Sequence, residues 1–287
     1  MTAGREGRRR LTPRRSSFRT VALLTLIPVF ALLLILVWSF VAMNVRFPAT
    51  RAHKAPHLEA TAVVTPRHRG DIVLILDDVG FDHQPVDAAM AIDPNINFSV
   101  LPNAAHAREV ATMLHERGFE VLCHLPMEPE QYPRVSPGSG AVLTSMTDAE
   151  IARTTLENVQ AVPYARGVNN HMGSRATADR RVMESVLAAL PEDMYFIDSR
   201  TTPTSVAAPL ARAMHIREAT RDVFLDDVEN ESAIRQQLDI LAREAQQRGI
   251  AVGIGHMYPP TIRVLTAEVP RLRREGFRFI RASRAVR

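Results

Sequence analysis

Short apolar runs that end at acidic residues or histidines mark where this sequence could carry out chemistry. The first run, residues 72–76, is apolar throughout and leads into the adjacent carboxylates Asp77 and Asp78. An apolar run this short, without polar alternation, is typical of a parallel strand that is buried on both faces. Its charged neighbours then lie at its carboxyl end, where α/β folds place their ligands. Neighbours on an extended strand point in opposite directions, so we expect the two aspartates to have different tasks.

The same pattern recurs at the ends of five later apolar runs. The polar residues found there are His124, Asn169, Asn170 and His171, Asp198, Asp226, and His256. Histidine and aspartate, in a chain with one cysteine, are typical ligands of a divalent metal such as Zn²⁺. A catalytic zinc keeps one position open, a nearby carboxylate can act as general base, and a histidine can protonate the leaving group. The pattern therefore predicts a metal-dependent hydrolytic site.

Alternating strands and helices are expected to position these residues. Strands are predicted over 72–76, 96–101, 119–123, 167–170, 194–197, 223–225, 250–254 and 277–280, and helices over 85–92, 105–117, 148–162, 179–189, 206–214, 231–248 and 261–274. Asp148 and Asp179 are predicted N-caps, and Gly249 is a predicted helix end. This inventory favours an α/β fold, a distorted (β/α) barrel whose strand ends converge on one mouth. A doubly wound open sheet is the alternative.

The segment before the barrel has the features of a membrane anchor. Residues 21–45 carry no charge, and this length suffices to cross a hydrocarbon core of ~30 Å as a single transmembrane helix. Residues 1–20 contain seven arginines and one glutamate, which predicts a cytoplasmic N-terminus. We expect a basic tail over 1–20, an anchor over 21–45, a linker over 46–70 and a barrel domain over 71–287. The barrel would then lie in the periplasm, tethered to the inner membrane.

The charge distribution argues against a nucleic-acid partner. The whole chain carries +4 and the first twenty residues carry +6, which leaves −2 for the remainder. A nucleic-acid-binding domain is expected to carry its basic face on the fold rather than on a tail. The single cysteine, Cys123, excludes an internal disulfide framework and a cysteine-based zinc cluster.

Several multi-residue motifs, in order, resemble those of the polysaccharide deacetylase superfamily, and in particular its divergent branch. They are LDDVG at 76–80, HLPMEP at 124–129, NNHMGS at 169–174, FIDSRT at 196–201, VFLD at 223–226 and IGH at 254–256. The resemblance covers about residues 71 to 287. It implies a distorted (β/α) barrel of the glycoside hydrolase/deacetylase type and metal-dependent removal of acetyl groups from a glycan.

Carried over residue by residue, the resemblance implies roles for four positions. Asp77 matches the general base, Asp78 and His124 match metal ligands, and His256 matches the general acid. The family's second ligand histidine, about four residues after the first, is replaced here by Glu128. The third ligand is therefore either His171, which lies at a strand end, or Glu128, which two prolines bracket; the strand-end position favours His171.

The family's arginine-proline-tyrosine substrate motif is also absent. Other polar or aromatic residues near the strand ends are expected to bind substrate instead: Asn169, Asn170, Arg175, Asp198 and Tyr258. The resulting hypothesis is a membrane-anchored, zinc-dependent carbohydrate deacetylase that acts on a cell-envelope polysaccharide. The alternative is a catalytically weak glycan-binding or scaffold protein that keeps the barrel.

Overall fold

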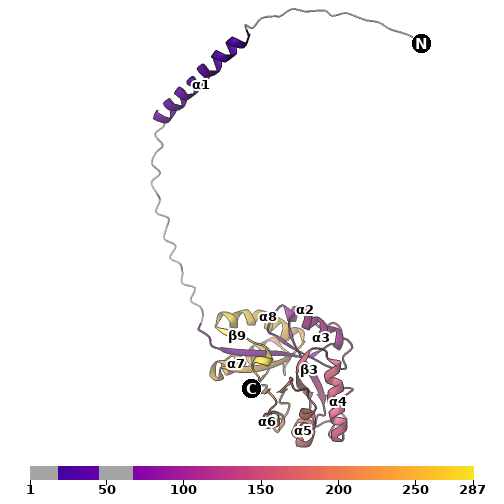
Figure 1. The fold of residues 1–287 in the computed structure, drawn as a ribbon. Helices are drawn as coiled ribbons and strands as arrows, with labels where there is room; N and C mark the ends of the chain where they lie inside the picture. The colour runs from indigo at the N-terminus through magenta and orange to yellow at the C-terminus, as the bar shows by residue number, and fades with distance from the viewer. Residues whose placement is uncertain (1–18, 45–66) are drawn as a thin grey trace, which may run out of the picture. The chain divides into compact units, whose positions relative to one another are not determined.

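The computed structural model describes residues 19–44 and 67–287 (Figure 1). The chain divides into two compact units, Met1–Ala62 and Val63–Arg287. In the first unit, α1 spans Arg19–Asn44, and its side chains are described from Ala31 onward. Among the described residues, no helix has the length and apolar character required to span a membrane. The expectations for residues 1–18 and 45–66, most of the tail and linker, lie outside the described residues.

In the second unit, parallel strands form one curled sheet. The described strands are β1 (Gly70–Val79), β2 (Asn97–Val100), β3 (Glu120–Met127), β4 (Ala165–Met172), β5 (Tyr195–Asp198), β6 (Glu218–Thr220), β7 (Val223–Phe224), β8 (Ile250–His256) and β9 (Phe277–Phe279). Their order is β6-β5-β4-β3-β2-β1-β8-β7, and β9 pairs with the first residues of β1. Because β6 and β7 are the two ends of this path, the sheet is a half-barrel that is open between them. The predicted barrel class is confirmed in this coarser form.

Helices connect the strands and cover the outside of the sheet (Figure 1). They are α2 (Val86–Met90), α3 (Ala107–Glu116), α4 (Asp148–Ala161), α5 (Arg180–Ala188), α6 (Ala207–Ala213), α7 (Glu231–Arg248) and α8 (Pro259–Arg274). Asp179 caps α5 as predicted, and Gly249 ends α7 in the left-handed conformation with φ 84°. The predicted cap Asp148 was wrong by one residue. Thr147 caps α4 in a reciprocal capping box with Glu150.

Side chains alternate along β1 between two hydrophobic cores. Ile72, Leu74 and Leu76 pack outward in the core formed with the helices. Val73 and Ile75 point inward, into a second core that also contains Leu122, Tyr195, Ile197, Val252 and Ile254. The strand is therefore buried on both faces, as the sequence predicted. The next inward position after 73 and 75 is 77, at the carboxyl end of the strand.

The segment that follows β9 closes the amino-terminal end of the half-barrel. The Ile280 N–H donates to Ile72, the Ala282 N–H donates to the Asn97 side chain, and Ser283 donates twice to the buried carboxylate of Glu120. The last residue, Arg287, exchanges two backbone hydrogen bonds with Glu218 of β6. Beyond Ile280, which falls in the predicted strand 277–280, this closing segment (residues 280–287) was not predicted from the sequence. Nor was β6, which is short and begins with a charged residue.

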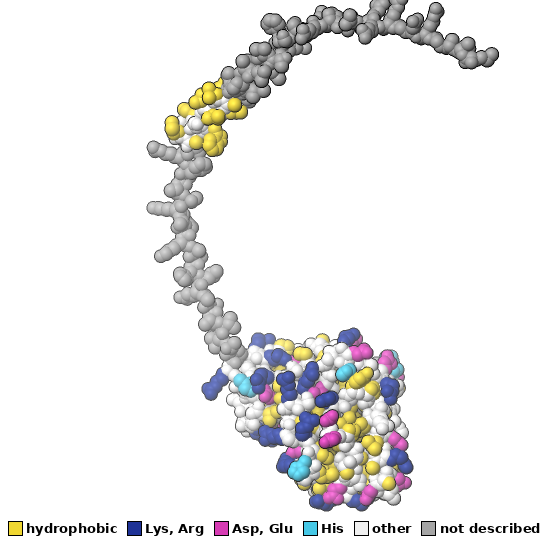
Figure 2. Space-filling view, in the orientation of Figure 1, with side chains coloured by type: hydrophobic (Ala, Val, Ile, Leu, Met, Phe, Trp, Pro, Cys, Tyr) yellow, Lys and Arg dark blue, Asp and Glu magenta, His cyan; other side chains and the backbone are white. Residues whose placement is uncertain are grey.

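Charges of both signs are mixed over the surface of the second unit. Figure 2 shows arginine side chains among aspartate and glutamate side chains on the face that it displays. Many of them form ion pairs, such as Arg278 with Asp71 at 2.8 Å and Arg263 with Glu231 at 2.8 Å. This mixture agrees with the near-neutral charge that the sequence assigns to the residues beyond the basic tail.

Candidate active site and metal centre

A cavity of about 440 Å³ lies at the carboxyl ends of the strands. Its lining includes most of the residues that the sequence singled out: Asp77, Asp78, His124, Asn170, His171, His256 and Tyr258. Asp77 and His256 are register partners on the neighbouring strands β1 and β8. His124 and Asn169 are register partners on β3 and β4 in the same way. Strand pairing thus places side chains from distant parts of the sequence around one opening.

The two adjacent aspartates do not face opposite sides, contrary to the prediction from strand alternation. Asp77 continues the inward series of β1 and is buried, with 3% of its surface exposed. Asp78 would point outward in a regular strand, but its φ of 59° is left-handed and the pairing register of β1 with β2 shifts there. Aspartate is among the few residues that adopt this conformation readily. Both carboxylates consequently reach His124.

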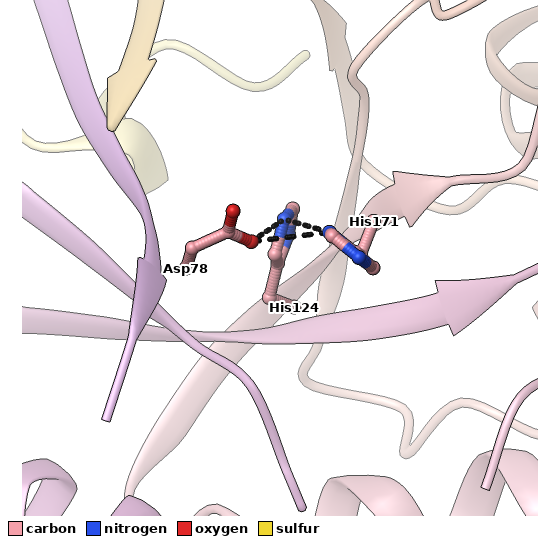
Figure 3. Close-up of side chains that lie close together, drawn as sticks. All are labelled: Asp78, His124 and His171. Carbon is pink, nitrogen blue, oxygen red and sulfur yellow. Dashed lines mark hydrogen bonds and ion pairs between the residues drawn. The ribbon is translucent and has the colours of Figure 1, made fainter. Parts of the chain in front are cut away.

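Asp78, His124 and His171 form a compact cluster of possible metal ligands (Figure 3). Asp78 Oδ1 lies 3.3 Å from His124 Nε2 and 3.1 Å from His171 Nδ1, and the two ring nitrogens are 3.3 Å apart. Asp78 Oδ1 is buried yet has no hydrogen bond of acceptable geometry. Edges of a tetrahedral zinc site with bonds of ~2.0–2.1 Å are about 3.3 Å long. The donor types, the spacing and the orphaned oxygen all fit a divalent ion.

The electrostatics of the cluster favour bound positive charge. Burial by itself raises the pKa of Asp78, but the adjacent His124 and His171 outweigh it and hold that pKa well below its ordinary range. Burial by itself lowers the pKa of His124, whereas Asp77 and Asp78 raise it, with a net upward shift. Two carboxylates beside the buried His124 and the half-buried His171 therefore attract either protons or a cation.

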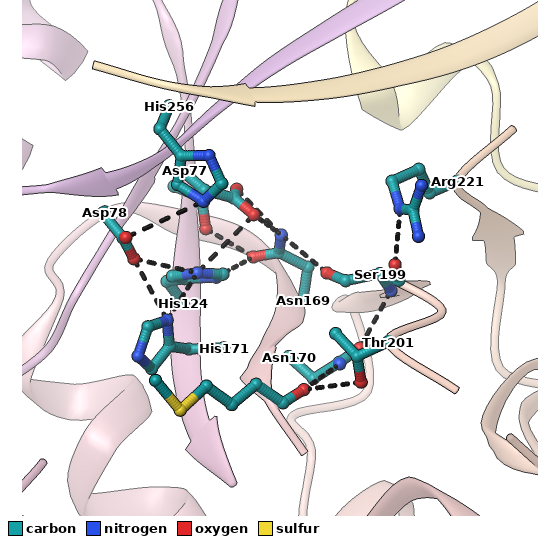
Figure 4. Close-up of polar contacts among 12 residues, drawn as sticks. Asp77, Asp78, His124, Asn169, Asn170, His171, Ser199, Thr201, Arg221 and His256 are labelled. Atoms are coloured by element: carbon teal, nitrogen blue, oxygen red, sulfur yellow. Dashed lines mark hydrogen bonds and ion pairs between the residues drawn. The ribbon is translucent and has the colours of Figure 1, made fainter. Parts of the chain in front are cut away.

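Asn169 connects the cluster to the neighbouring carboxylate (Figure 4). Its amide oxygen accepts from His124 Nδ1 at 2.9 Å and from the Ser99 hydroxyl. Its amide nitrogen donates to both oxygens of Asp77, at 2.9 and 3.1 Å, and to Ser199 at 3.2 Å. Since Nδ1 of His124 carries the proton in this arrangement, Nε2 presents a lone pair toward Asp78 and His171.

Asp77 has the environment of a general base rather than of a ligand. Burial raises the pKa of its carboxyl above the ordinary value, and the nearby His124 and His256 oppose this rise only in part. The shortest distance from its carboxylate to His124 Nε2 is 3.5 Å, and Asn169 holds both of its oxygens. A carboxylate with a raised pKa is a stronger proton acceptor than an ordinary one.

His256 is paired with a second buried carboxylate, Asp226. Asp226 Oδ1 lies 2.9 Å from His256 Nδ1, while Oδ2 accepts from the His256 backbone N–H at 2.6 Å and from Thr261 at 2.7 Å. His256 Nε2 is turned toward Asp78, 3.8 Å from Oδ2. Burial lowers the pKa of His256, but Asp226 and the other carboxylates outweigh it and raise the pKa to about 9. The sequence marked Asp226 as a strand end but gave it no role.

Glu128, the alternative third ligand, lies outside the ligand cluster. Its carboxylate accepts from the Thr144 N–H at 2.6 Å, from the Thr144 hydroxyl at 2.7 Å and from Arg175 Nη1 at 2.8 Å. Burial raises the pKa of Glu128, and the contacts with Thr144 and Arg175 more than reverse that effect. Between the two alternatives, the structure places His171 in the cluster. Arg175 is joined to Glu128 and to the Glu130 carbonyl.

The other residues expected to bind substrate differ in how open they are. Asn169 is fully buried and bonded within the protein, so its side chain is closed to a ligand. Asn170 is 1% exposed and links Met172 to Ser199. Asp198 accepts from the Arg200 N–H and from Ser205, and these bonds shape the loop after β5.

Tyr258 lies on the cavity wall, where its ring stacks on His256 with centroids 5.2 Å apart. The cavity lining also includes residues to which the sequence gave no role: Ser199, Arg200 and Thr201 of the FIDSRT motif, Phe224 of the VFLD motif, and Arg221, which belongs to none of the motifs. Arg221 lies between two very short strands, β6, which the sequence did not predict, and β7.

A family model described as divergent polysaccharide deacetylase matches residues 74–286. The Escherichia coli (strain K12) protein YibQ is 37% identical over 205 residues, which is 71% of this chain and 64% of YibQ, so the match spans less than two thirds of that relative. A Haemophilus influenzae protein is 35% identical over 198 residues, covering 68% of this chain and 70% of its own length.

Among solved structures, the fold resembles that of the Agrobacterium tumefaciens protein ATU2773, with a TM-score of 0.73 at 20% identity over 76% of this chain and 90% of that one.

Proposed function

The chain belongs to the divergent polysaccharide deacetylase family, and on this premise we propose that it is a metal-dependent hydrolase that removes acetyl groups from a cell-envelope polysaccharide. The observation that carries the proposal is the gathering of the Asp78, His124 and His171 cluster beside Asp77 and His256 in one cavity. A glycan-binding protein needs neither a buried base nor a paired acid. Their joint presence favours hydrolysis.

Zinc is the metal that we propose for Asp78, His124 and His171. Two imidazole nitrogens and one carboxylate oxygen are the ligand set of many catalytic zinc sites. When bound, the ion would supply Lewis acidity toward the acyl carbonyl and toward water. The protein's part is to keep His124 Nε2 unprotonated toward the site, which the bond from its Nδ1 to Asn169 accomplishes.

Asp77 is proposed to take the proton of the attacking water. Its raised pKa supports this role, because the carboxylate is a stronger base than a solvated aspartate. Asn169 donates to both Asp77 oxygens and fixes their direction. The proton acceptor therefore does not have to reorient during the reaction.

His256 is proposed to protonate the departing sugar amine or hydroxyl. With a pKa of about 9 it carries its proton at neutral pH, and the bond between its Nδ1 and Asp226 directs Nε2 toward the cavity. Tyr258, which stacks on His256, offers a flat surface against which a sugar ring could pack. Asp77 and His256 lie next to each other on β1 and β8, so a proton acceptor and a proton donor are available at the same acyl group.

The proposed location is the outer side of the cytoplasmic membrane, and the support comes from the sequence alone. Residues 21–45 are uncharged and follow seven arginines, the arrangement of an anchor with a cytoplasmic N-terminus. A reporter enzyme that is active only in the periplasm, fused after Arg287, should be active. Activity of a cytoplasmic reporter at the same position, with a silent periplasmic one, would reverse the proposed orientation.

The reaction is tested with the purified full chain in detergent, loaded with zinc. Acetate release is measured from a panel of acetylated glycans, with His124→Ala as the matched protein that lacks a ligand. We expect release by the parent and none by the variant. Zinc binding without release from any glycan would contradict the hydrolase and favour the glycan-binding alternative.

A further inference from the structure

Two arginines line one side of the cavity. Arg200 follows β5, and Arg221 lies between β6 and β7, whereas the proposed metal ligands come from β1, β3 and β4. In the view of Figure 4, Arg221 lies beyond Ser199, on the side away from Asp78. The cavity thus has a metal-binding half and a cationic half.

The Arg221 side chain is held in place before any ligand arrives. Its Nε donates to the Ser199 carbonyl at 2.6 Å and its Nη2 donates to the Arg200 carbonyl at 2.9 Å. Its guanidinium carbon lies 4.9 Å from the centre of the Phe224 ring. These contacts occupy two of the five N–H donors and leave the others available. An immobilised guanidinium loses little side-chain entropy when it binds a ligand.

The positive charge of this half has no ion-pair partner among the described residues. In the described part of the chain, neither Arg200 nor Arg221 lies within 4.0 Å of a carboxylate oxygen. Arg221 is half-buried. Burial and the neighbouring Arg200 lower its pKa, and the carboxylates of Asp77, Asp198 and Asp227 oppose this shift only in part. Asp227 also lines the cavity, but its side chain is exposed to solvent. An anion placed between the two guanidiniums would supply the missing counter-charge.

We infer that the substrate is an acidic glycan, in which a carboxylate or phosphate group close to the acylated position binds to Arg221 and Arg200. The inference rests on the proposed function for the reaction itself. The anion site is separate from the metal ligands, so its occupation can be measured without turnover. Planar guanidiniums bind both carboxylate and phosphate through paired hydrogen bonds, and the test separates the two.

The experiment measures dissociation constants by calorimetry on the zinc-loaded full chain in detergent. The carboxylate probe is a hyaluronan tetrasaccharide, compared with the same tetrasaccharide after reduction of its carboxyl groups. The phosphate probe is N-acetylglucosamine 6-phosphate, compared with N-acetylglucosamine. Arg221→Gln and Arg200→Gln are the test variants. Arg217→Gln, an exposed arginine outside the cavity, is the matched control.

We expect at least one acidic probe to bind about tenfold or more tightly than its neutral counterpart, a difference that Arg221→Gln abolishes and Arg217→Gln preserves. Arg200→Gln removes no described side-chain contact. It should therefore reduce the difference in affinity between acidic and neutral probes without altering thermal stability. Equal binding of acidic and neutral probes, or no binding of either acidic probe, overturns the inference. If acetate is released from neutral glycans and an acidic group on the glycan does not increase the release, the proposed function is supported and this inference is contradicted. Arginine-dependent binding of an acidic probe without any acetate release would support the anion site and contradict the proposed hydrolysis.

Discussion

The Nδ1–H of His124 donates to the side-chain oxygen of Asn169 over 2.9 Å. This bond fixes the tautomer of the imidazole, so the lone pair on Nε2 faces Asp78 and His171. The amide of the same asparagine holds both oxygens of Asp77. One buried side chain therefore orients a proposed metal ligand and the proposed base together.

Asn169→Leu should weaken zinc binding about 10–100-fold, the usual effect of removing the hydrogen-bond partner of a ligand histidine. Zinc affinity is measured by competition with a chromophoric chelator. Asn230→Ala is the control, because Asn230 caps α7 through the Ala233 N–H and its loss costs about 1 kcal/mol of stability without touching the site. Equal zinc affinity in the Asn169 variant and the parent would show that this bond does not orient the ligand.

Asp78→Ala and His124→Ala should each lose bound zinc, because each removes one of three ligands. Asp77→Asn should retain zinc and lose about 10²–10⁴-fold in rate, the usual contribution of a general base. Glu128→Gln should retain both zinc and activity, since its contacts are with Thr144 and Arg175. Metal content and acetate release are measured on the same preparations. Full zinc occupancy in the Asp78 and His124 variants would show that the site is wrongly assigned.

Asp226→Asn should lower the pKa of His256 from about 9 toward its ordinary value of about 6.5. The reason is that Asp226, the carboxylate that most strongly raises this pKa against the effect of burial, is replaced by a neutral amide. NMR titration of the His256 ring in metal-free protein measures this pKa directly. In the zinc-loaded variant, the alkaline limb of the pH–activity profile should move to lower pH. The raised pKa has a further consequence for stability. Protonated His256 stabilises the fold fully below about pH 6.5, and this contribution disappears as the pH rises through about 9. An unchanged titration in the variant would contradict the pairing.

Glu120→Ala should destabilise the domain by about 3 kcal/mol. The buried carboxylate accepts from the Tyr195 hydroxyl at 2.7 Å and from both the N–H and the hydroxyl of Ser283, and each buried donor left without a partner costs about 1–3 kcal/mol. Denaturant unfolding measures the loss. The control is Glu116→Ala on the exposed face of α3, expected within about 0.5 kcal/mol of the parent. Zinc affinity should be unchanged, because Glu120 lies at the opposite end of the strands from the cavity.

Most of the site was predictable because it follows the period-two alternation of buried strands. Asp77 and His256 extend the inward series of β1 and β8, and His124 follows the inward Leu122 of β3. The same rule failed at Asp78, where a left-handed residue breaks the alternation and turns the second carboxylate to the same side. Alternation is a property of regular backbone, and local composition did not indicate where the regularity ends.

The cationic half of the cavity and the closing segment were not predictable for a different reason. Arg221 and residues 280–287 have no periodic pattern of their own, and their positions depend on contacts with Ser199, Glu120 and Glu218 from elsewhere in the chain. A single sequence without pairing information carries no signal for such contacts. The choice between His171 and Glu128 was open for the same reason, since only the register of β3 with β4 brings His171 beside His124.

The sheet order has a consequence for how this domain folds. The three proposed metal ligands lie on β1, β3 and β4, which join through β2 into a contiguous half of the sheet. His256 reaches them only when β8 pairs with β1, a contact between opposite ends of the domain, and such non-local pairings form slowly because a long loop must close first. During refolding, zinc protection of the ligand histidines should therefore precede the pairing of β8 with β1 that brings His256 to the cluster, so that a metal-loaded but inactive intermediate accumulates before activity returns.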